Sequence, residues 1–305
     1  MHHHHDHQRV PPLLALAFVV VWSTGYIAGP VAVEAFAPLS VLTYRFGLAA
    51  LLAAAVAYAR HGWPSSWRGA GRHAGVGLTL NGLQFGLMYL AFGAGLEPTL
   101  GALLHSLSPV MTVLLAGFLL RERVRPVQVA GFVLGVAGVL LVLGPEVEAA
   151  GGPVGLVLGA LAALCLSLGW LGQRGLSTAL PPAWSATVQL AASVPPLLVV
   201  GMLTEGVWPV QDTGTFAWSV VWLAVVNSVA GLLLIQALVR EGGAGASSSV
   251  LFLSPPVTAV MAYVWFGDTL DLRELVGLVV ATLGVAVATR VRSPQRVADR
   301  HELGL

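Results

Sequence analysis

Residues 107–112 read Leu-Ser-Pro-Val-Met-Thr, and residues 253–258 read Leu-Ser-Pro-Pro-Val-Thr. These motifs lie 146 positions apart, and the same shift aligns residues 99–142 with residues 245–288 without a gap. Leucine, serine, proline, threonine and several glycines recur at matching places along both segments. The chain therefore contains an internal repeat, and its two halves are expected to share one fold.

Ten apolar stretches occupy most of the sequence. Each approaches the ~20 residues that an α-helix needs to cross the hydrocarbon core of a bilayer. A chain that is 56% hydrophobic and 10% charged, with a mean hydropathy of +0.82, has too little polar surface to fold as a water-soluble protein. In lipid, by contrast, a helix satisfies its own backbone groups. The sequence predicts an all-α membrane protein with ten transmembrane helices, at Leu13–Gly29, Leu39–Tyr58, Ala74–Gly93, Leu100–Leu120, Val127–Leu143, Val154–Leu171, Ala183–Met202, Phe216–Val239, Ala244–Phe266 and Leu275–Ala288.

The two halves are expected to be inverted relative to each other. Each half holds five spans, and an odd number of spans makes the second half enter the membrane from the opposite side. The connections agree, because residues 121–125 are Arg-Glu-Arg-Val-Arg, whereas the equivalent residues 267–271 are Gly-Asp-Thr-Leu-Asp. We expect five-helix repeats at residues 13–145 and 153–290, with tails at 1–12 and 291–305.

The distribution of arginine predicts the orientation. If the first span starts in the cytoplasm, thirteen of the fifteen basic residues fall in the even-numbered connections and the two tails. Cytoplasmic loops carry such an excess, so both termini are expected inside, in a bacterial inner membrane. The run Met1-His-His-His-His-Asp-His is interpreted as a tag remnant or a tail, with metal binding as the alternative.

Glycine pairs also mark the repeat, since Gly131 and Gly138 correspond to Gly277 and Gly284. With the two Leu-Ser-Pro motifs, the Arg121-Glu-Arg turn and the segment Thr43-Tyr-Arg-Phe, they make the chain resemble EamA-type members of the drug/metabolite transporter superfamily. The resemblance implies ten helices in two inverted repeats around a central cavity. It also implies a metabolite exporter, similar to the YddG-type exporters of aromatic amino acids, and leaves the substrate open.

We therefore expect an exporter of small neutral or zwitterionic metabolites, above all amino acids and including aromatic ones, that works by alternating access. A proton-coupled exporter of drugs or other metabolites is the alternative. We expect no enzymatic activity, no cofactor, no metal and no nucleic-acid binding. The protein is expected to be a monomer in the bilayer. A role as a membrane scaffold is disfavoured, because the sequence has no large loops to recruit partners. A hydrolase built on His105 and Ser108 is disfavoured, because no oxyanion motif accompanies these residues.

Amide and aromatic side chains within the spans are the candidate substrate-binding residues. Inverted repeats place the substrate near the midplane, at the repeat interface. Asn81 and Gln84 share one face of the third span, and Asn227 is the repeat counterpart of Asn81. Trp22 and Trp170 are approximate counterparts that supply flat apolar surface. The alternative roles are hydrogen bonding between helices for the amides and interfacial belts for the indoles.

Two residues with basic side chains lie inside the predicted spans. His105 is the only histidine there, and it either lines the substrate site or is a buried neutral structural residue. Arg45 can hold one substrate carboxylate, but an ion pair with Glu34 or Glu97, or snorkelling toward the surface, is the favoured interpretation. No Asp or Glu lies inside any predicted span, which argues against exchange of cationic drugs for protons.

Proline and glycine predict local features of the helices. Pro109 and Pro255 remove a backbone donor in mid-helix and free a carbonyl one turn back, which either kinks the helix or exposes the carbonyl to the cavity. Gly131 and Gly135 have the spacing that lets two helices approach closely. We expect that contact to lie within the chain.

Overall fold

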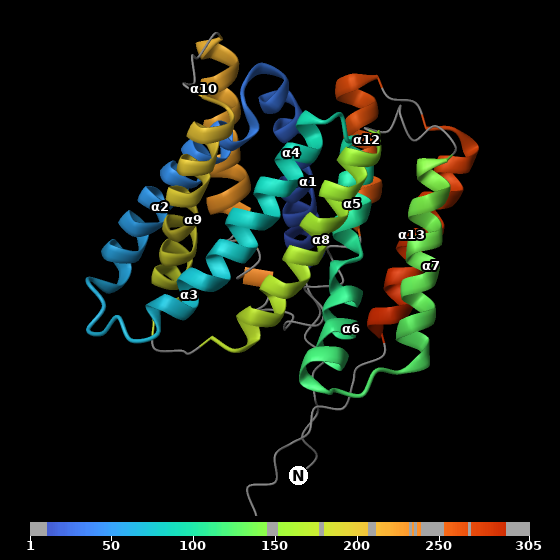
Figure 1. The fold of residues 1–305 in the computed structure, drawn as a ribbon, viewed down its shortest axis with the longest axis horizontal. Helices are drawn as coiled ribbons and strands as arrows, with labels where there is room; N and C mark the ends of the chain where they lie inside the picture. The colour runs from blue at the N-terminus through green and yellow to red at the C-terminus, as the bar shows by residue number, and fades with distance from the viewer. Residues whose placement is uncertain are drawn as a thin grey trace, which may run out of the picture.

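A computed structural model of the chain describes residues 11–144, 152–176, 180–206, 212–231, 234, 237, 238, 253–267 and 270–290. Within these ranges every regular element is a helix, as Figure 1 shows. Nine helical segments in the described residues are long and apolar enough to cross a membrane. The predicted all-α membrane architecture is therefore confirmed. The histidine run and the tail 291–305 lie outside the described residues.

The helices follow the predicted spans closely. The elements are α1 Pro12–Ala35, α2 Pro38–His61, α3 Ala70–Gly77, η1 Leu78–Leu83, α4 Gln84–Gly93, α5 Pro98–Ser106, α6 Ser108–Leu120, α7 Pro126–Leu143, α8 Gly152–Arg174, α9 Pro182–Thr204, α10 Thr213–Val221, η2 Trp222–Ala230, α12 Ser254–Phe266 and α13 Leu272–Arg290. Proline is the first residue of α1, α2, α5, α7 and α9, where its missing N–H is harmless and its fixed φ suits the first turn. The part of the ninth predicted span before Leu253 is outside the described residues.

Several spans are interrupted at repeat-related places. The fourth predicted span divides at Leu107 into α5 and α6, two residues before Pro109, so the regular hydrogen-bond pattern changes beside the predicted proline. The third predicted span contains the π-helical turns of η1, and the eighth contains those of η2. Under the 146-residue shift η1 falls within η2, so both halves carry the same irregularity. Such π turns often occur at functional sites.

The repeats meet where α7 packs against α13. Hypothetical Cβ atoms show how close the backbones are: one at Gly131 would lie 2.6 Å from the carbonyl oxygen of Gly284, and one at Gly277 would lie 2.8 Å from that of Gly138. The earlier glycine of α7, Gly131, meets the later glycine of α13, Gly284, and the later glycine of α7 meets the earlier one of α13. The two helices are therefore antiparallel. Because Gly131 corresponds to Gly277 and Gly138 to Gly284, the contact maps onto itself when the repeats are exchanged. The inverted relation is thus visible in the packing, and the predicted close contact lies within the chain.

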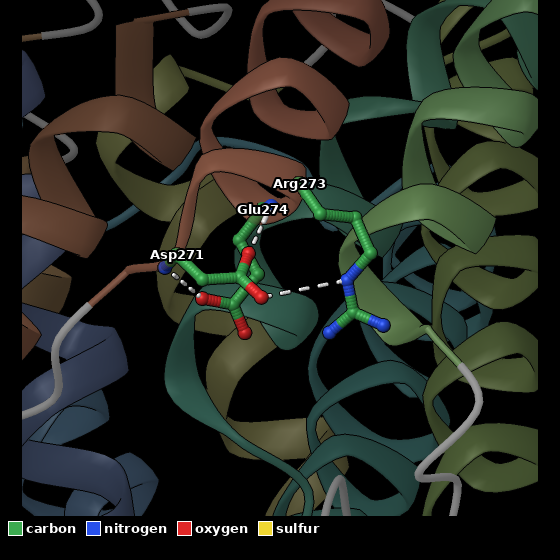
Figure 2. A network of polar contacts seen from close by, with 3 residues as sticks. All are labelled: Asp271, Arg273 and Glu274. Atoms are coloured by element: carbon green, nitrogen blue, oxygen red, sulfur yellow. Dashed lines mark hydrogen bonds and ion pairs between the residues drawn. The ribbon is translucent and has the colours of Figure 1, made fainter.

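The first turns of α7 and α13 show the same inversion. At the start of α13 the backbone N–H of Asp271 donates to Glu274 at 2.7 Å, and that of Glu274 donates to Asp271 at 2.7 Å (Figure 2). At the equivalent place in α7, the N–H of Arg125 donates to the side chain of Gln128 at 2.9 Å. One cap is therefore acidic and the other basic. In Figure 1, α7 starts at the lower end of the bundle and α13 starts at the upper end.

Arg273, the one basic residue that the sequence places on the acidic side, is accounted for at this cap. Its Nε lies 3.7 Å from Asp271 Oδ2, as Figure 2 shows. Its guanidinium also lies against Gly144, the residue that ends α7 with a φ of 62°. A cation is favourable at a helix C-terminus, where unsatisfied carbonyl groups point outward.

Closing the glycine contact tests this packing. Gly138→Ala and Gly284→Ala each place a methyl group against backbone atoms of the facing helix, so we expect each to lower the free energy of unfolding by about 1–3 kcal/mol. Thermal melts in detergent measure the change. Gly47→Ala in α2 is the matched control, because its Cβ meets nothing within 4 Å and alanine favours a helix. Equal melting temperatures for all three variants would contradict the packing described.

Candidate functional site

Polar side chains from α1, α2, α4, α5 and η2 form two buried groups inside the bundle. The histidine cluster consists of Tyr26, Gln84 and His105. The arginine cluster consists of Arg45, Tyr89, Asn227 and Ser228. Both groups include residues from α4, and both lie against α1. The arginine cluster joins the two repeats, and the histidine cluster lies within the first; together they are the candidate site.

The histidine cluster is a chain of hydrogen bonds with His105 in the middle. Nδ1 of His105 lies 2.7 Å from the Tyr26 hydroxyl, and Nε2 lies 3.0 Å from the amide nitrogen of Gln84. Because that amide nitrogen donates, Nε2 accepts and Nδ1 donates to the hydroxyl, which is the neutral form of the ring. Tyr26, Gln84 and His105 are all buried. Gln84 and His105, both predicted as site residues, are thus brought together, in an arrangement that a structural histidine also adopts.

Arg45 is the centre of the arginine cluster. Its Nη1 donates to the Tyr89 hydroxyl at 2.9 Å, its Nη2 to the Asn227 side-chain oxygen at 2.7 Å, and its Nε to the Ser228 hydroxyl at 3.1 Å. The side chain is only 2% exposed. Three aromatic rings surround the guanidinium, with the Cζ of Arg45 4.6 Å from the Phe85 centroid, 5.1 Å from that of Phe46 and 5.9 Å from that of Tyr89.

The favoured expectation for Arg45 was wrong. The guanidinium neither snorkels to the surface nor bonds to Glu34 or Glu97 in the described part of the chain, because its hydrogen bonds go to neutral oxygens. The described helices carry carboxylates only in terminal turns, Glu34 in α1 and Glu274 in α13. The sequence did hold the relevant signal, namely an arginine inside a span with no acidic residue in any predicted span.

Asn227 links the arginine cluster to α1. Its amide nitrogen donates to the carbonyl oxygens of Val21 at 3.0 Å and Trp22 at 3.2 Å. Gly25 permits this approach, because a Cβ there would lie 2.7 Å from the same amide nitrogen. Asn227 therefore has the helix-bridging role considered as its alternative, and it also orients Arg45. Being in π-helical η2, it sits where the regular backbone hydrogen-bond pattern changes.

The other predicted site residues, Asn81, Trp22 and Trp170, are less closely connected to the histidine and arginine clusters. Asn81 lies in η1 with a partly exposed side chain and makes no hydrogen bond among the described residues. Trp22 packs beside the core, with its ring 5.7 Å from that of Phe18, and makes a polar side-chain contact with Tyr26. Trp170 in α8 is 39% exposed, and no contact shown in the described residues joins it to either cluster.

The Leu-Ser-Pro motifs are held by a pair of repeat-related hydrogen bonds. The Ser23 hydroxyl of α1 donates to the carbonyl oxygen of Ser254 at 3.4 Å. The Ser167 hydroxyl of α8 donates to the carbonyl oxygen of Ser108, the repeat counterpart of Ser254, at 3.1 Å. The two motifs are thus held to α1 and α8 in the same manner.

A cavity of about 750 Å³ lies at the end of the bundle away from the arginine-rich turns. It is lined by the α1–α2 connection, by the ends of α4 and α9, and by Glu34, Tyr44 and Glu205. Glu205 accepts hydrogen bonds from the backbone N–H of Leu39 at 2.8 Å and of Ser40 at 3.1 Å, which ties the end of α9 to the start of α2. Burial raises the pKa of the Glu205 carboxyl, and these two hydrogen bonds oppose the rise.

One buried histidine escaped the sequence analysis. Because α3 begins at Ala70 rather than Ala74, His73 belongs to the third span, and the statement that His105 is the only histidine inside a span was wrong. His73 is 2% exposed and its Nδ1 lies 2.7 Å from the Ser185 hydroxyl. No group of three or more His, Cys, Asp or Glu residues in the described ranges could hold a metal ion.

Known proteins resemble the chain in sequence and in fold. The chain is 28% identical over 299 residues to a probable amino-acid metabolite efflux pump of Salmonella typhimurium, covering 93% of this chain and 97% of that protein. It is 30% identical over 226 residues to the aromatic amino acid exporter YddG of Ancylobacter novellus, covering 70% of this chain and 72% of that protein. A solved crystal structure with 21% sequence identity aligns over 93% of this chain and 98% of its own, with a TM-score of 0.63, which shows a common fold.

The family assignment comes from both halves of the sequence. The model of the EamA-like transporter family matches residues 10–144 and matches again at residues 153–290. Together these segments cover nearly the whole chain, and each holds one Leu-Ser-Pro motif. The chain belongs to the EamA-like transporter family and is a multi-pass membrane transporter of the drug/metabolite type.

Proposed function

We propose that this transporter exports small neutral or zwitterionic metabolites, amino acids above all, from the bacterial cytoplasm by alternating access. The observation that carries the proposal is the composition of the buried site, where one guanidinium, amides, hydroxyls and a neutral imidazole gather with aromatic rings. Such groups bind a carboxylate, an ammonium and an apolar side chain without a fixed negative charge. Two relatives named as an amino-acid metabolite efflux pump and an aromatic amino acid exporter support the same substrate class.

Alternating access is supported by the inverted repeats and their interrupted helices. In the described ranges the larger cavity is open at the end opposite the arginine-rich turns, while a cavity of about 360 Å³ lies at the arginine-rich end, between α3 and α8. Exchange of the two repeat conformations closes one opening and enlarges the other. The substrate site proposed here comprises Trp22, Asn81, Gln84, His105, Trp170 and Asn227, together with Arg45.

The orientation of the termini is a separate proposal, and it rests on the arginine distribution. We expect cysteines placed at Glu97 and Asp212 to react with a membrane-impermeant thiol reagent on intact cells. Those at Arg68 and Arg123 should react only after the cells are opened. A background with Cys165→Ser removes the single native thiol. The reverse labelling pattern would mean that the termini lie outside.

Purified protein in proteoliposomes tests the transport proposal. We expect flux of labelled amino acids down their own gradient, with little stimulation by an imposed proton gradient, because the described helices carry no carboxylate away from their end turns. A panel of amino acids, organic cations and sugars compares the substrate classes. The absence of flux for every amino acid in the panel would refute the proposal.

His105 is the group most able to introduce proton coupling. Strong driving by a pH gradient that disappears in His105→Ala would favour the proton-coupled exporter instead. Gln84→Ala is the matched variant, since it removes one partner of the imidazole but leaves the titratable group in place.

The two repeat-related asparagines are expected to differ. Asn81→Ala should weaken substrate binding by about 1–3 kcal/mol while leaving thermal stability near that of the wild type, because Asn81 makes no hydrogen bond among the described residues. Asn227→Ala should lower both substrate affinity and thermal stability, since it breaks contacts to Arg45 and to α1. Calorimetric titration and thermal melts measure the two effects. Trp63→Ala, 70% exposed before α3, is the control, and normal transport by Asn81→Ala would remove that residue from the site.

A further inference from the structure

Arg45 is a buried cation whose hydrogen-bond partners are all neutral. It lies seven residues after Pro38, which puts it about 10 Å along the axis of α2 from its first residue. Its three acceptors are the oxygens of Tyr89, Asn227 and Ser228, and the side chain is 2% exposed. A charge buried in this way is expensive unless it is paired. The described neighbours solvate the guanidinium but do not neutralise it.

The guanidinium also keeps unused donors. Arginine carries five N–H groups, and the cluster engages one on each of its three nitrogens. One N–H on Nη1 and one on Nη2 therefore have no partner in the described residues. Two N–H groups are the number that one carboxylate accepts in a bidentate pair. The aromatic rings of Phe46, Phe85 and Tyr89 contact the cation but carry no negative charge.

The second repeat does not carry this charge. Gln189 lies seven residues after Pro182 in α9, as Arg45 does after Pro38 in α2. The packing is repeated too, because α2 contacts η2 and α9 contacts η1. Gln189 is buried and donates to the Ser185 hydroxyl at 3.1 Å, so the same position is filled by a neutral amide. The fold therefore does not require a cation here, and Arg45 is a feature of one half only.

We propose that Arg45 binds the carboxylate of the transported metabolite, which serves as the counter-ion that the described residues do not provide. This inference rests on the proposed function and specifies its substrate as a monocarboxylate, with an α-amino acid as the simplest case. Phe85 and Tyr89 then lie beside the bound carboxylate, and Asn227 holds the guanidinium in position from η2.

The larger cavity lies beside the first turns of α2, the helix that carries Arg45. Tyr44 and Leu90 line that cavity, and they are the chain neighbours of Arg45 and Tyr89. Ser40, which also lines it, belongs to the first turn of α2, five residues before Arg45. This cavity lies at the end of the bundle that the arginine distribution assigns to the outside.

Removing the charge gives the first test. Proteoliposomes and detergent-solubilised protein are offered L-phenylalanine and its neutral-carboxyl analogue L-phenylalaninamide. We expect the wild type to prefer the acid over the amide by roughly tenfold or more, and Arg45→Gln to lose most of that preference. The preference is a ratio within one protein, so a lower yield of folded Arg45→Gln does not affect it.

Supplying an internal counter-ion gives the second test and does not require removal of Arg45. Ser228→Asp puts a carboxylate beside Nε of Arg45, whereas Ser228→Asn puts an amide of the same shape there. The aspartate variant should bind L-phenylalanine roughly tenfold or more weaker than the asparagine variant, although its melting temperature is no lower, because the guanidinium is already paired. Only the charge differs between the two variants.

The outcomes separate the two proposals. A wild type that moves L-phenylalanine but treats the acid and the amide alike overturns the role of Arg45 and leaves amino-acid export standing. Equal binding by the two Ser228 variants, or an unchanged preference in folded Arg45→Gln, overturns it as well. A wild type that moves no amino acid refutes the proposed function, and the role of Arg45 falls with it.

Discussion

The absence of water in the hydrocarbon core is the constraint on which the structure depends, because each polar group there must find its partner inside the protein. Uninterrupted helices satisfy most backbone groups. At the junction of α5 and α6, the Ser108 carbonyl accepts hydrogen bonds from the hydroxyls of Ser167 and Thr112. The same requirement packs His105 between Tyr26 and Gln84 and surrounds Arg45 with oxygens and rings. Polar chemistry is thus confined to the places where the helices are irregular or meet.

Close contact between α7 and α13 relates the two halves. Each helix offers glycine at equivalent positions, so the backbones of two copies of one segment touch across an approximate two-fold axis. The central groups do not obey this symmetry, since Arg45 faces η2 where Gln189 occupies the matching position in α9. A symmetric frame therefore holds an asymmetric site, as expected when the frame moves and the site recognises one end of an unsymmetrical solute.

The sequence predicted the spans, the inversion and the glycine contact, because apolar length, loop charge and residue spacing are local properties. It predicted that Gln84 and His105 belong to one site, but not that Tyr26 completes the cluster. The contact between Arg45 and Asn227 joins residues 182 positions apart, and no pattern in a single sequence fixes such a pairing. The π turns and the earlier start of α3, which brings in His73, depend on tertiary packing and also stayed hidden.

The caps of α7 and α13 show which residues set the helix geometry and which set the charge of the turns. Arg125 with Gln128, and Asp271 with Glu274, close the first turns of α7 and α13 by the same backbone geometry with different charges. The glycine contact between the helices lies beyond these turns. Folding information and insertion information therefore reside in separate residues. A duplicated segment can reverse its direction of entry by exchanging charges in its turns, while the surface through which the copies recognise each other is conserved.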